Sequence, residues 1–257
     1  MSEAHVTVYP ADRTVEQTEG HSTDHSVVAH HFEDLAQQRE ANRLGLWVFL
    51  STEVLFFGVL LTGYWVFRTV YPAAFHEASQ HLNIVLGTLN TAILLGSSLA
   101  VALAVHAAAE LSADHPDAAA HGNGHEEHAG AHKAQKRRQV IALLLTTTVL
   151  GLIFLGIKGY EYYIDYEENL IPGLNFLWEG EEGQVAELFF TLYFVTTGMH
   201  ALHMIIGLAI AATMAFLAGR GWYDRDPMPV ELFGLYWHFV DVVWIFVFPF
   251  YYLIGRT

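Results

Sequence analysis

Three polar side chains that could act as acids, bases or metal ligands occur inside apolar stretches of the 257-residue sequence. Glu53 stands in LWVFLSTEVLFFGVLL, and His200 and His203 stand in VTTGMHALHMIIG. The i, i+3 spacing of the histidines places both on one face of a helix. A carboxyl group and two imidazoles could relay protons, because burial disfavours the charged form of each. They could instead ligate a metal ion, or His200 could ligate a haem.

A structural role is the alternative for the same three residues. Interhelical hydrogen bonds in a membrane contribute about 1 kcal/mol each and would lock neighbouring helices together. An ionised side chain at the bilayer centre costs about 3 kcal/mol, so Glu53 must be neutral or paired. We interpret Glu53, His200 and His203 as one buried polar cluster. Asp241, in YWHFVDVVWIFVF, is the second acid that the sequence places well inside an apolar stretch.

Five long apolar stretches must position these residues. Each is close to the roughly 20 residues that a helix needs to cross about 30 Å of hydrocarbon. Prolines and polar runs separate them, for example at Pro72, Pro172 and Pro227. The sequence therefore predicts an all-α fold, an integral-membrane bundle of five transmembrane helices at about 44–67, 82–106, 140–158, 187–218 and 232–254.

The composition agrees with a membrane protein and excludes several other classes. Apolar residues make up 53% of the chain and charged residues only 15%, against about a quarter in soluble domains. The formal charge of −15 argues against binding to nucleic acid phosphates. The absence of cysteine excludes disulfides, thiolate metal sites and iron–sulfur clusters.

The distribution of basic residues predicts the orientation. Nine of the 12 Lys and Arg residues fall on the side that holds the N-terminus, so we expect that terminus inside and the C-terminus outside. Residues 1–42 are expected to form a mobile, polar cytoplasmic tail, and residues 43–257 the membrane domain with a His-rich cytoplasmic loop at 112–138. That loop is either a solvated linker or a weak Zn²⁺ or Cu²⁺ site formed by His121, His125, His128 and His132.

Three residues near the predicted inner surface are candidate contacts for lipid or for a partner protein. His238 and Trp237 lie about two turns inside that surface, where an imidazolium could meet a lipid phosphate. A histidine snorkelling within an aromatic belt is the alternative. Arg220 is included for its charge at an inner helix end. The sequence also predicts an interfacial belt of aromatic residues, namely Trp47, Tyr64, Trp65, Tyr160, Tyr162, Tyr163, Trp222, Tyr236, Trp237, Tyr251 and Tyr252.

Four motifs make the sequence resemble subunit III of haem–copper terminal oxidases, the cytochrome c oxidase subunit III family. The segment YWHFVDVVWIFVF at 236–248 is similar to the signature near the C-terminus of that family. The other three motifs occur in family order and are STEVLFFG at 51–58, LNTAILLGSS at 89–98 with GYEYY at 159–163, and FVTTGMHALHMIIG at 194–207. The resemblance runs from about residue 40 to residue 257 and touches all five spans.

The resemblance implies roles for individual residues. Glu53 matches the family's intramembrane carboxylate, and His200 and His203 match the paired histidines of the facing helix. The remaining family-motif polar residues are Glu161, His238 and Asp241. Subunit III of the family binds no haem or copper itself. In the family, subunit III packs on subunit I, the subunit that holds haem and copper. Subunit III also binds phospholipid and helps to sustain proton uptake.

The five spans resemble the bacterial short form of subunit III, because longer members have two further helices where this chain has a polar tail. We therefore expect a non-catalytic accessory subunit of a proton-pumping terminal oxidase in a bacterial inner (plasma) membrane. Its expected partners are oxidase subunits I and II and phospholipid, with copper in subunit II if cytochrome c is the electron donor. An accessory subunit of a nitric oxide reductase is the alternative within the resemblance. A free-standing transporter of protons or metal ions is a remote alternative from another class.

Overall fold

A computed structural model describes residues 35–113, 126–178, 182–223 and 226–254. The chain divides into two units, residues 1–42 and residues 43–257. Of the first unit we describe only the start of its helix at Leu35, and everything below concerns residues 43–257. His121 and His125 of the predicted metal-binding loop lie outside the described residues, as does the predicted tail up to residue 34.

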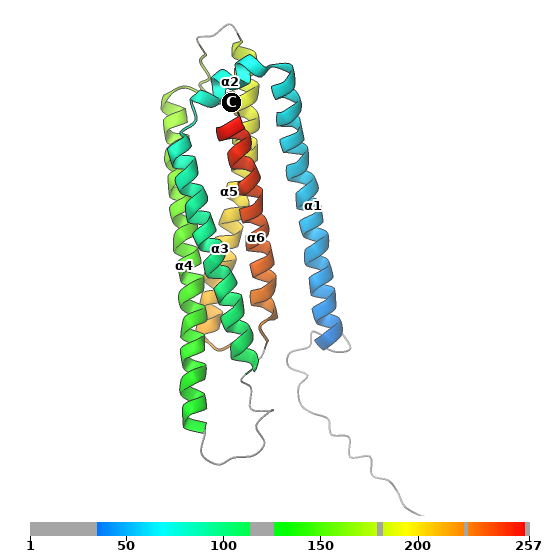
Figure 1. Cartoon of the computed structure of the whole chain (residues 1–257), viewed down its shortest axis with the longest axis vertical. Coiled ribbons are helices and arrows are strands. Elements are labelled where there is room, and N and C mark those ends of the chain that lie inside the picture. The colour runs from blue at the N-terminus through cyan, green and yellow to red at the C-terminus, as the bar shows by residue number, and fades with distance from the viewer. Residues whose placement is uncertain (1–34, 114–125, 179–181, 224–225, 255–257) are drawn as a thin grey trace, which may run out of the picture. The chain divides into compact units, whose positions relative to one another are not determined.

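The described residues contain helices and no strand, which confirms the predicted all-α class. Five helices are long and apolar enough to cross a membrane. Figure 1 shows them running alternately up and down. In chain order the helices are α1 (Leu35–Val70), the short α2 (Pro72–Gln80), α3 (Ile84–Ala113), α4 (Glu126–Glu167), α5 (Gly183–Gly219) and α6 (Met228–Phe248), which continues into the π-helical turn η2 (Pro249–Leu253).

The boundary of α4 differs most from the predicted one. The predicted span ended at 158, whereas α4 continues to Glu167 and carries the GYEYY motif inside the helix. At its other end α4 begins within the predicted His-rich loop. The polar stretch after Pro72 also differs, because it forms α2 with proline in its first turn, where the missing N–H costs no hydrogen bond.

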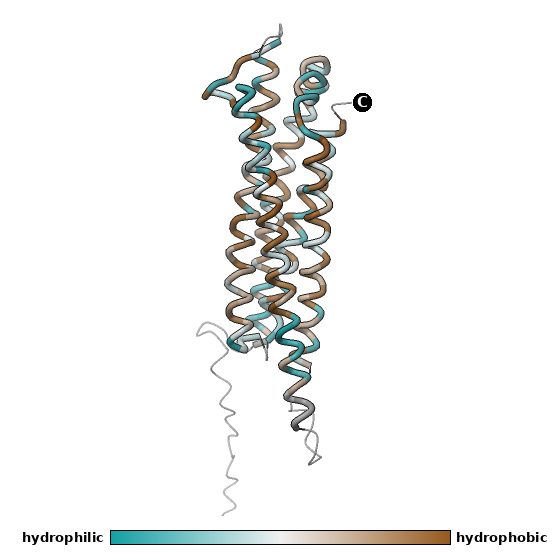
Figure 2. The backbone as a smooth tube through the Cα atoms, turned by 90° about the vertical axis from the view of Figure 1, so that its left-hand side faces the viewer, coloured by the Kyte–Doolittle hydropathy of each residue, from teal (hydrophilic) through white to brown (hydrophobic). Residues whose placement is uncertain are grey.

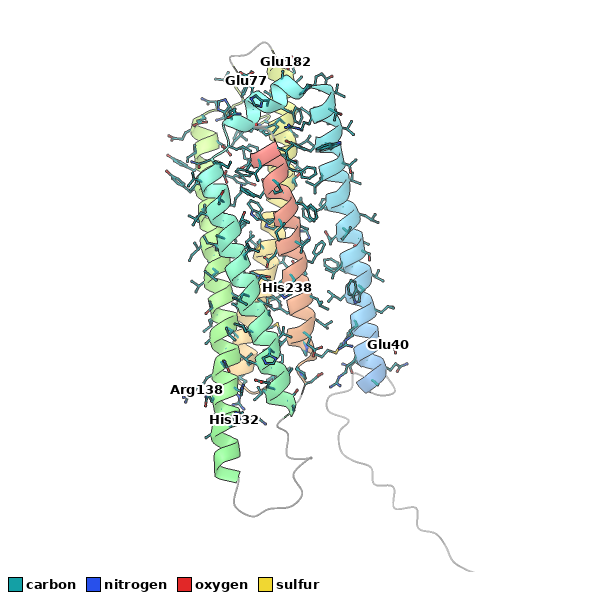
Figure 3. All side chains as sticks on the ribbon, viewed as in Figure 1. Glu40, Glu77, His132, Arg138, Glu182 and His238 are labelled. Atoms are coloured by element: carbon teal, nitrogen blue, oxygen red, sulfur yellow. The ribbon has the colours of Figure 1, made fainter. Side chains whose placement is uncertain are left out.

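Apolar residues fill the middle of each long helix, and hydrophilic residues gather toward the helix ends (Figure 2). Figure 3 places Glu77 and Glu182 at one end of the bundle and Arg138 at the other. We call these the Glu77 end and the Arg138 end. The predicted orientation, with the Arg138 end inside, stays a prediction.

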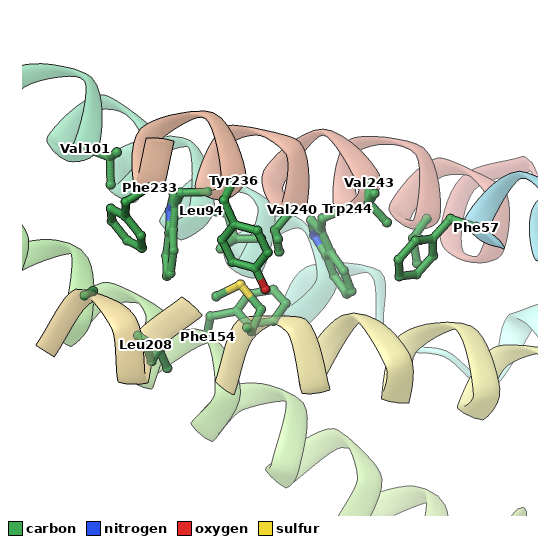
Figure 4. Close-up of a cluster of buried hydrophobic side chains, with 14 of the residues drawn as sticks. Phe57, Leu94, Val101, Phe154, Leu208, Phe233, Tyr236, Val240, Val243 and Trp244 are labelled. Carbon is green, nitrogen blue, oxygen red and sulfur yellow. The ribbon is translucent and has the colours of Figure 1, made fainter. Parts of the chain in front are cut away.

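Helices α3 to α6 pack closely against one another, whereas α1 reaches them through long side chains. Phe57 of α1 joins the buried cluster formed with Phe154, Trp244 and neighbouring residues (Figure 4). Near the Glu77 end, the ring of Tyr64 lies 4.5 Å from that of Tyr251. Contacts between side chains at several points along its length therefore attach α1 to the other helices, without close packing of the backbones.

Glycines allow the close approach of α5 and α6. A Cβ atom on Gly207 would lie 3.0 Å from a ring carbon of Trp237 and 3.1 Å from one of Tyr236. Gly156 on α4 is different, because a Cβ atom there would meet nothing within 4 Å. Both glycines lie in helix interiors, so they form a matched pair for mutation.

Replacing Gly207 by valine is expected to destabilise the protein by about 1 to 3 kcal/mol, because the added atoms overlap two buried rings. Gly156→Val places the same atoms on an open surface and should be near neutral. The thermal unfolding midpoint of each variant, purified in mild detergent, measures the difference. Equal midpoints for the two variants would contradict the packing of α5 on α6.

Candidate functional site

The structure pairs Glu53 with one of the two predicted histidines. A carboxylate oxygen of Glu53 on α1 lies 3.1 Å from Nε2 of His203 on α5. The side chains are 18% and 10% exposed, so the pair is largely shielded by protein. Phe57, one helical turn beyond Glu53, packs edge-on against the imidazole at 5.5 Å. The pair therefore links α1 to α5 in the apolar part of both helices.

One ring nitrogen of His203 is hydrogen-bonded to the backbone, and the other faces Glu53. Its Nδ1 lies 2.8 Å from the carbonyl oxygen of Met199, which can only accept, so Nδ1 carries a proton. A single proton shared between Nε2 and the facing oxygen of Glu53 would make this contact a hydrogen bond and leave the pair without net charge. Such a pair is far cheaper to bury than a lone carboxylate.

His200 lies apart from this pair. It is 1% exposed, and its ring packs against Phe154 at 5.5 Å and against Trp244 at 5.1 Å. Neither ring nitrogen has a hydrogen-bond partner in the described part of the chain. The structure thus gives His200 no hydrogen bond to Glu53 or His203, and its place in one cluster with them stays a prediction. Its surroundings in the described part of the chain are those of a core histidine packed between aromatic rings.

A groove near the Arg138 end reaches a second set of polar residues. The groove has a volume of about 490 Å³ between α1, α3 and α6, and we call it the α1–α3–α6 groove. Its lining includes Arg43, Trp47, Val105, Glu231, Leu235 and His238.

Two predicted residues of α6 lie at and beyond this groove. Nδ1 of the half-buried His238 is 2.7 Å from the hydroxyl oxygen of Ser98 on α3. Asp241, one turn further along α6, is 3% exposed, and neither of its carboxyl oxygens has a hydrogen-bond partner among the described residues. Asp241 thus lies at depth in the bundle without the ion pair that would offset its burial.

The third group of buried polar residues surrounds Lys158 near the Glu77 end. Its ammonium group donates to Glu161 at 2.8 Å, to the hydroxyl of Tyr193 at 2.9 Å and to that of Tyr252 at 3.0 Å. Tyr252 in turn donates to the other oxygen of Glu161 at 2.6 Å. We call Lys158, Glu161, Tyr193 and Tyr252 the Lys158 cluster. It joins α4, α5 and η2 through a buried ion pair.

Sequence reasoning found Glu161 only through the family motif and missed Lys158 as an interior residue. Lys158 is the last residue of the predicted span 140–158, but its side chain is 3% exposed and lies within 6 Å of four aromatic rings. The signal was present, because Lys158 and Glu161 are spaced i, i+3 and share a helix face. Asp165, one turn beyond Glu161, is also buried at 2% exposure.

The remaining predicted residues lie in different surroundings. Trp237 is 0% exposed, and its indole N–H donates to the hydroxyl of Ser97, so it cannot contact lipid as predicted. Arg220 is exposed at the end of α5, above the ring of Phe216 at 4.2 Å. His132 is exposed on α4, while His128 lies in that helix with its side chain outside the described part. Within the described residues, no group of three or more His, Asp or Glu could hold a metal ion.

Comparisons with known proteins agree on one family. A family model described as cytochrome c oxidase subunit III matches residues 178–256. A probable quinol oxidase subunit 3 of Staphylococcus aureus is 24% identical over 219 residues, which cover 85% of this chain and 91% of the relative. A probable cytochrome c oxidase subunit 3 of Rickettsia bellii is 28% identical over 238 residues, which cover 84% of this chain and 70% of the relative.

Proposed function

Because the chain belongs to the subunit III family of haem–copper terminal oxidases, we propose that it stabilises the catalytic subunit of such an oxidase and its proton-uptake side. The chain is an accessory subunit of that complex and a multi-pass protein of the bacterial plasma membrane. In the proposed complex, haem and copper lie in subunit I. Subunit II adds copper if cytochrome c is the donor.

The observation that carries this proposal is the extent of the match, since relatives named as oxidase subunit 3 cover 84% to 85% of the chain. The geometry adds a reason for a structural role. Glu53 on α1 contacts His203 on α5 at 3.1 Å, which suits a link between helices. Most of α1 remains exposed, including Leu44, Leu55 and Val59 at 66% to 71%, and this apolar face suits lipid or partner helices.

Lipid binding at the Arg138 end is part of the proposal. The exposed guanidinium of Arg220 ends an apolar helix, a position from which it can reach a lipid phosphate. The ring of Phe216 beneath it supplies an apolar contact for the first part of an acyl chain. His238 keeps access to the α1–α3–α6 groove, whereas the burial of Trp237 excludes it as a lipid contact.

Purification through a tag on this chain in a mild detergent tests the proposed function. We expect haem bands in the reduced-minus-oxidised spectrum, oxygen consumption with quinol or reduced cytochrome c, and subunits I and II in the mass spectrum. The donor that supports oxygen consumption identifies the type of oxidase. A complex that reduces nitric oxide but not oxygen, or a colourless protein without partners, would overturn the proposal.

A further inference from the structure

The α1–α3–α6 groove leads from the Arg138 end toward the interior of the bundle. Near its entrance, Arg43 of α1 pairs with Glu231 in the first turn of α6 at 3.1 Å. These side chains are 62% and 33% exposed, so the entrance carries charged, hydrated groups. His238 lines the groove seven residues further along α6, which corresponds to about 10 Å at 1.5 Å per residue. Figure 3 shows His238 well inside the end of that helix.

His238 connects the groove to the interior. Its Nδ1 contacts the hydroxyl oxygen of Ser98 at 2.7 Å, which leaves Nε2 as the ring nitrogen without a partner from the described chain. An imidazole can accept a proton at one nitrogen and release a proton from the other. A serine hydroxyl can likewise accept a hydrogen bond while donating its own proton. The two side chains can therefore carry a proton inward from the groove.

Asp241 lies where such a path would end. It is spaced i, i+3 from His238 and so shares its helix face. The hydroxyl group of Ser98 interacts with the carboxyl group of Asp241, although neither carboxyl oxygen meets the geometry of a full hydrogen bond with a described residue. The contrast with Glu161 is direct, because Glu161 has Lys158 and Tyr252 as partners. A carboxyl group without a cation is far cheaper to bury in a bilayer as the neutral acid than as an anion.

We propose that Asp241 is a proton-binding site at membrane depth, and that it exchanges protons with the solution at the Arg138 end through Ser98, His238 and the α1–α3–α6 groove. A proton enters at Nε2 of His238, and the Nδ1 proton passes to the oxygen of Ser98. The hydroxyl proton of Ser98 then passes to a carboxyl oxygen of Asp241. The reverse transfers empty the site, and no other reactant is consumed.

The charged groups along this path are few. His238 and Glu231 belong to α6, and Arg43 belongs to α1. The residue that α3 contributes is Ser98, which is uncharged. Because Arg43 and Glu231 neutralise each other, the entrance favours neither uptake nor release of a proton. The occupancy of the site then follows the proton concentration on that side of the membrane.

Infrared spectroscopy of the purified complex tests this proposal. The spectrum of the wild-type complex should contain a carbonyl band of a protonated carboxylic acid that Asp241→Asn removes. In heavy water this band should shift as soon as the solutions are mixed. With Ser98→Ala or His238→Phe the shift should be at least about tenfold slower, since each variant removes a positioned proton carrier.

Ser97→Ala provides the matched control. Ser97 is the neighbour of Ser98, but its hydroxyl accepts from the indole of Trp237, so this variant should leave the exchange rate unchanged. The absence of a band that Asp241→Asn removes would overturn the proposal, as would equal exchange rates in wild type and Ser98→Ala. The measurement needs no oxygen consumption, so its failure is distinct from failure of the proposed oxidase function.

Discussion

Lysine in place of Glu53 is expected to prevent assembly of the membrane complex, whereas glutamine at this position should leave most of it intact. The physical reason is the contact of Glu53 with Nε2 of His203, the ring nitrogen that is not bonded to the backbone. A glutamine amide can donate to Nε2 of His203 as the protonated carboxyl group does, so the link between α1 and α5 survives. A lysine ammonium group brings an unpaired charge to a site where insertion costs about 3 kcal/mol, or roughly a hundredfold in population.

The amount of this chain that purifies with its partners, measured on blots of solubilised membranes, tests the expectation. Glu77→Lys is the matched control, because Glu77 is exposed on α2, outside the long apolar helices. That variant should assemble like wild type. Normal assembly of Glu53→Lys would show that the carboxyl group of Glu53 is not held in an apolar surrounding.

The helices could be predicted from sequence because length and hydropathy alone decide what can cross a bilayer. The ends of the helices could not be predicted in the same way. In the sequence, polar residues that are buried inside a bundle cannot be distinguished from polar residues of a loop. The GYEYY motif illustrates the problem. The predicted third span ends just before this motif, whereas α4 continues through it and buries Glu161 and Asp165.

The sequence also could not predict which face of each helix points into the bundle. Helix α5 is apolar on all sides, so its pattern does not identify the face that meets α1. His200 and His203 share a face by spacing, yet one turns to Trp244 and the other to Glu53. The predicted aromatic belt divides for a similar reason. Trp47, Trp65 and Trp222 are 48% to 68% exposed, whereas Tyr64, Tyr251 and Tyr252 are 0% exposed and belong to the core.

The Lys158 cluster matters for stability because its members supply one another's hydrogen-bond donors and acceptors. All three protons of the Lys158 ammonium group are donated, and Glu161 accepts through both oxygens. The cluster thus joins the turn η2 to α4 and to α5, both of which lie well before it in sequence. Removing one charge from a buried pair leaves the other without compensation, which usually costs more than the intact pair contributes.

Lys158→Met is therefore expected to destabilise the complex by about 3 to 5 kcal/mol, because it leaves the Glu161 carboxylate buried without a cation. For a chain of this size that corresponds to a loss of roughly 6 to 20 °C in thermal midpoint. The double variant Lys158→Met with Glu161→Gln should recover most of the loss, since methionine packs well among aromatic rings and glutamine can still bond Tyr252.

Lys136→Met on the same helix is the matched control for the Lys158 variant. Lys136 also forms an ion pair, with Glu110, but the two side chains are 22% and 42% exposed. Water therefore solvates both charges when the pair is broken, and the expected cost is at most about 1 kcal/mol. Thermal midpoints in the same detergent compare the three variants. Two outcomes would contradict this explanation. One is a loss of thermal midpoint in Lys136→Met equal to that in Lys158→Met, and the other is a double variant no more stable than Lys158→Met alone. Either would mean that burial of the Lys158–Glu161 ion pair does not set the stability of this end of the bundle.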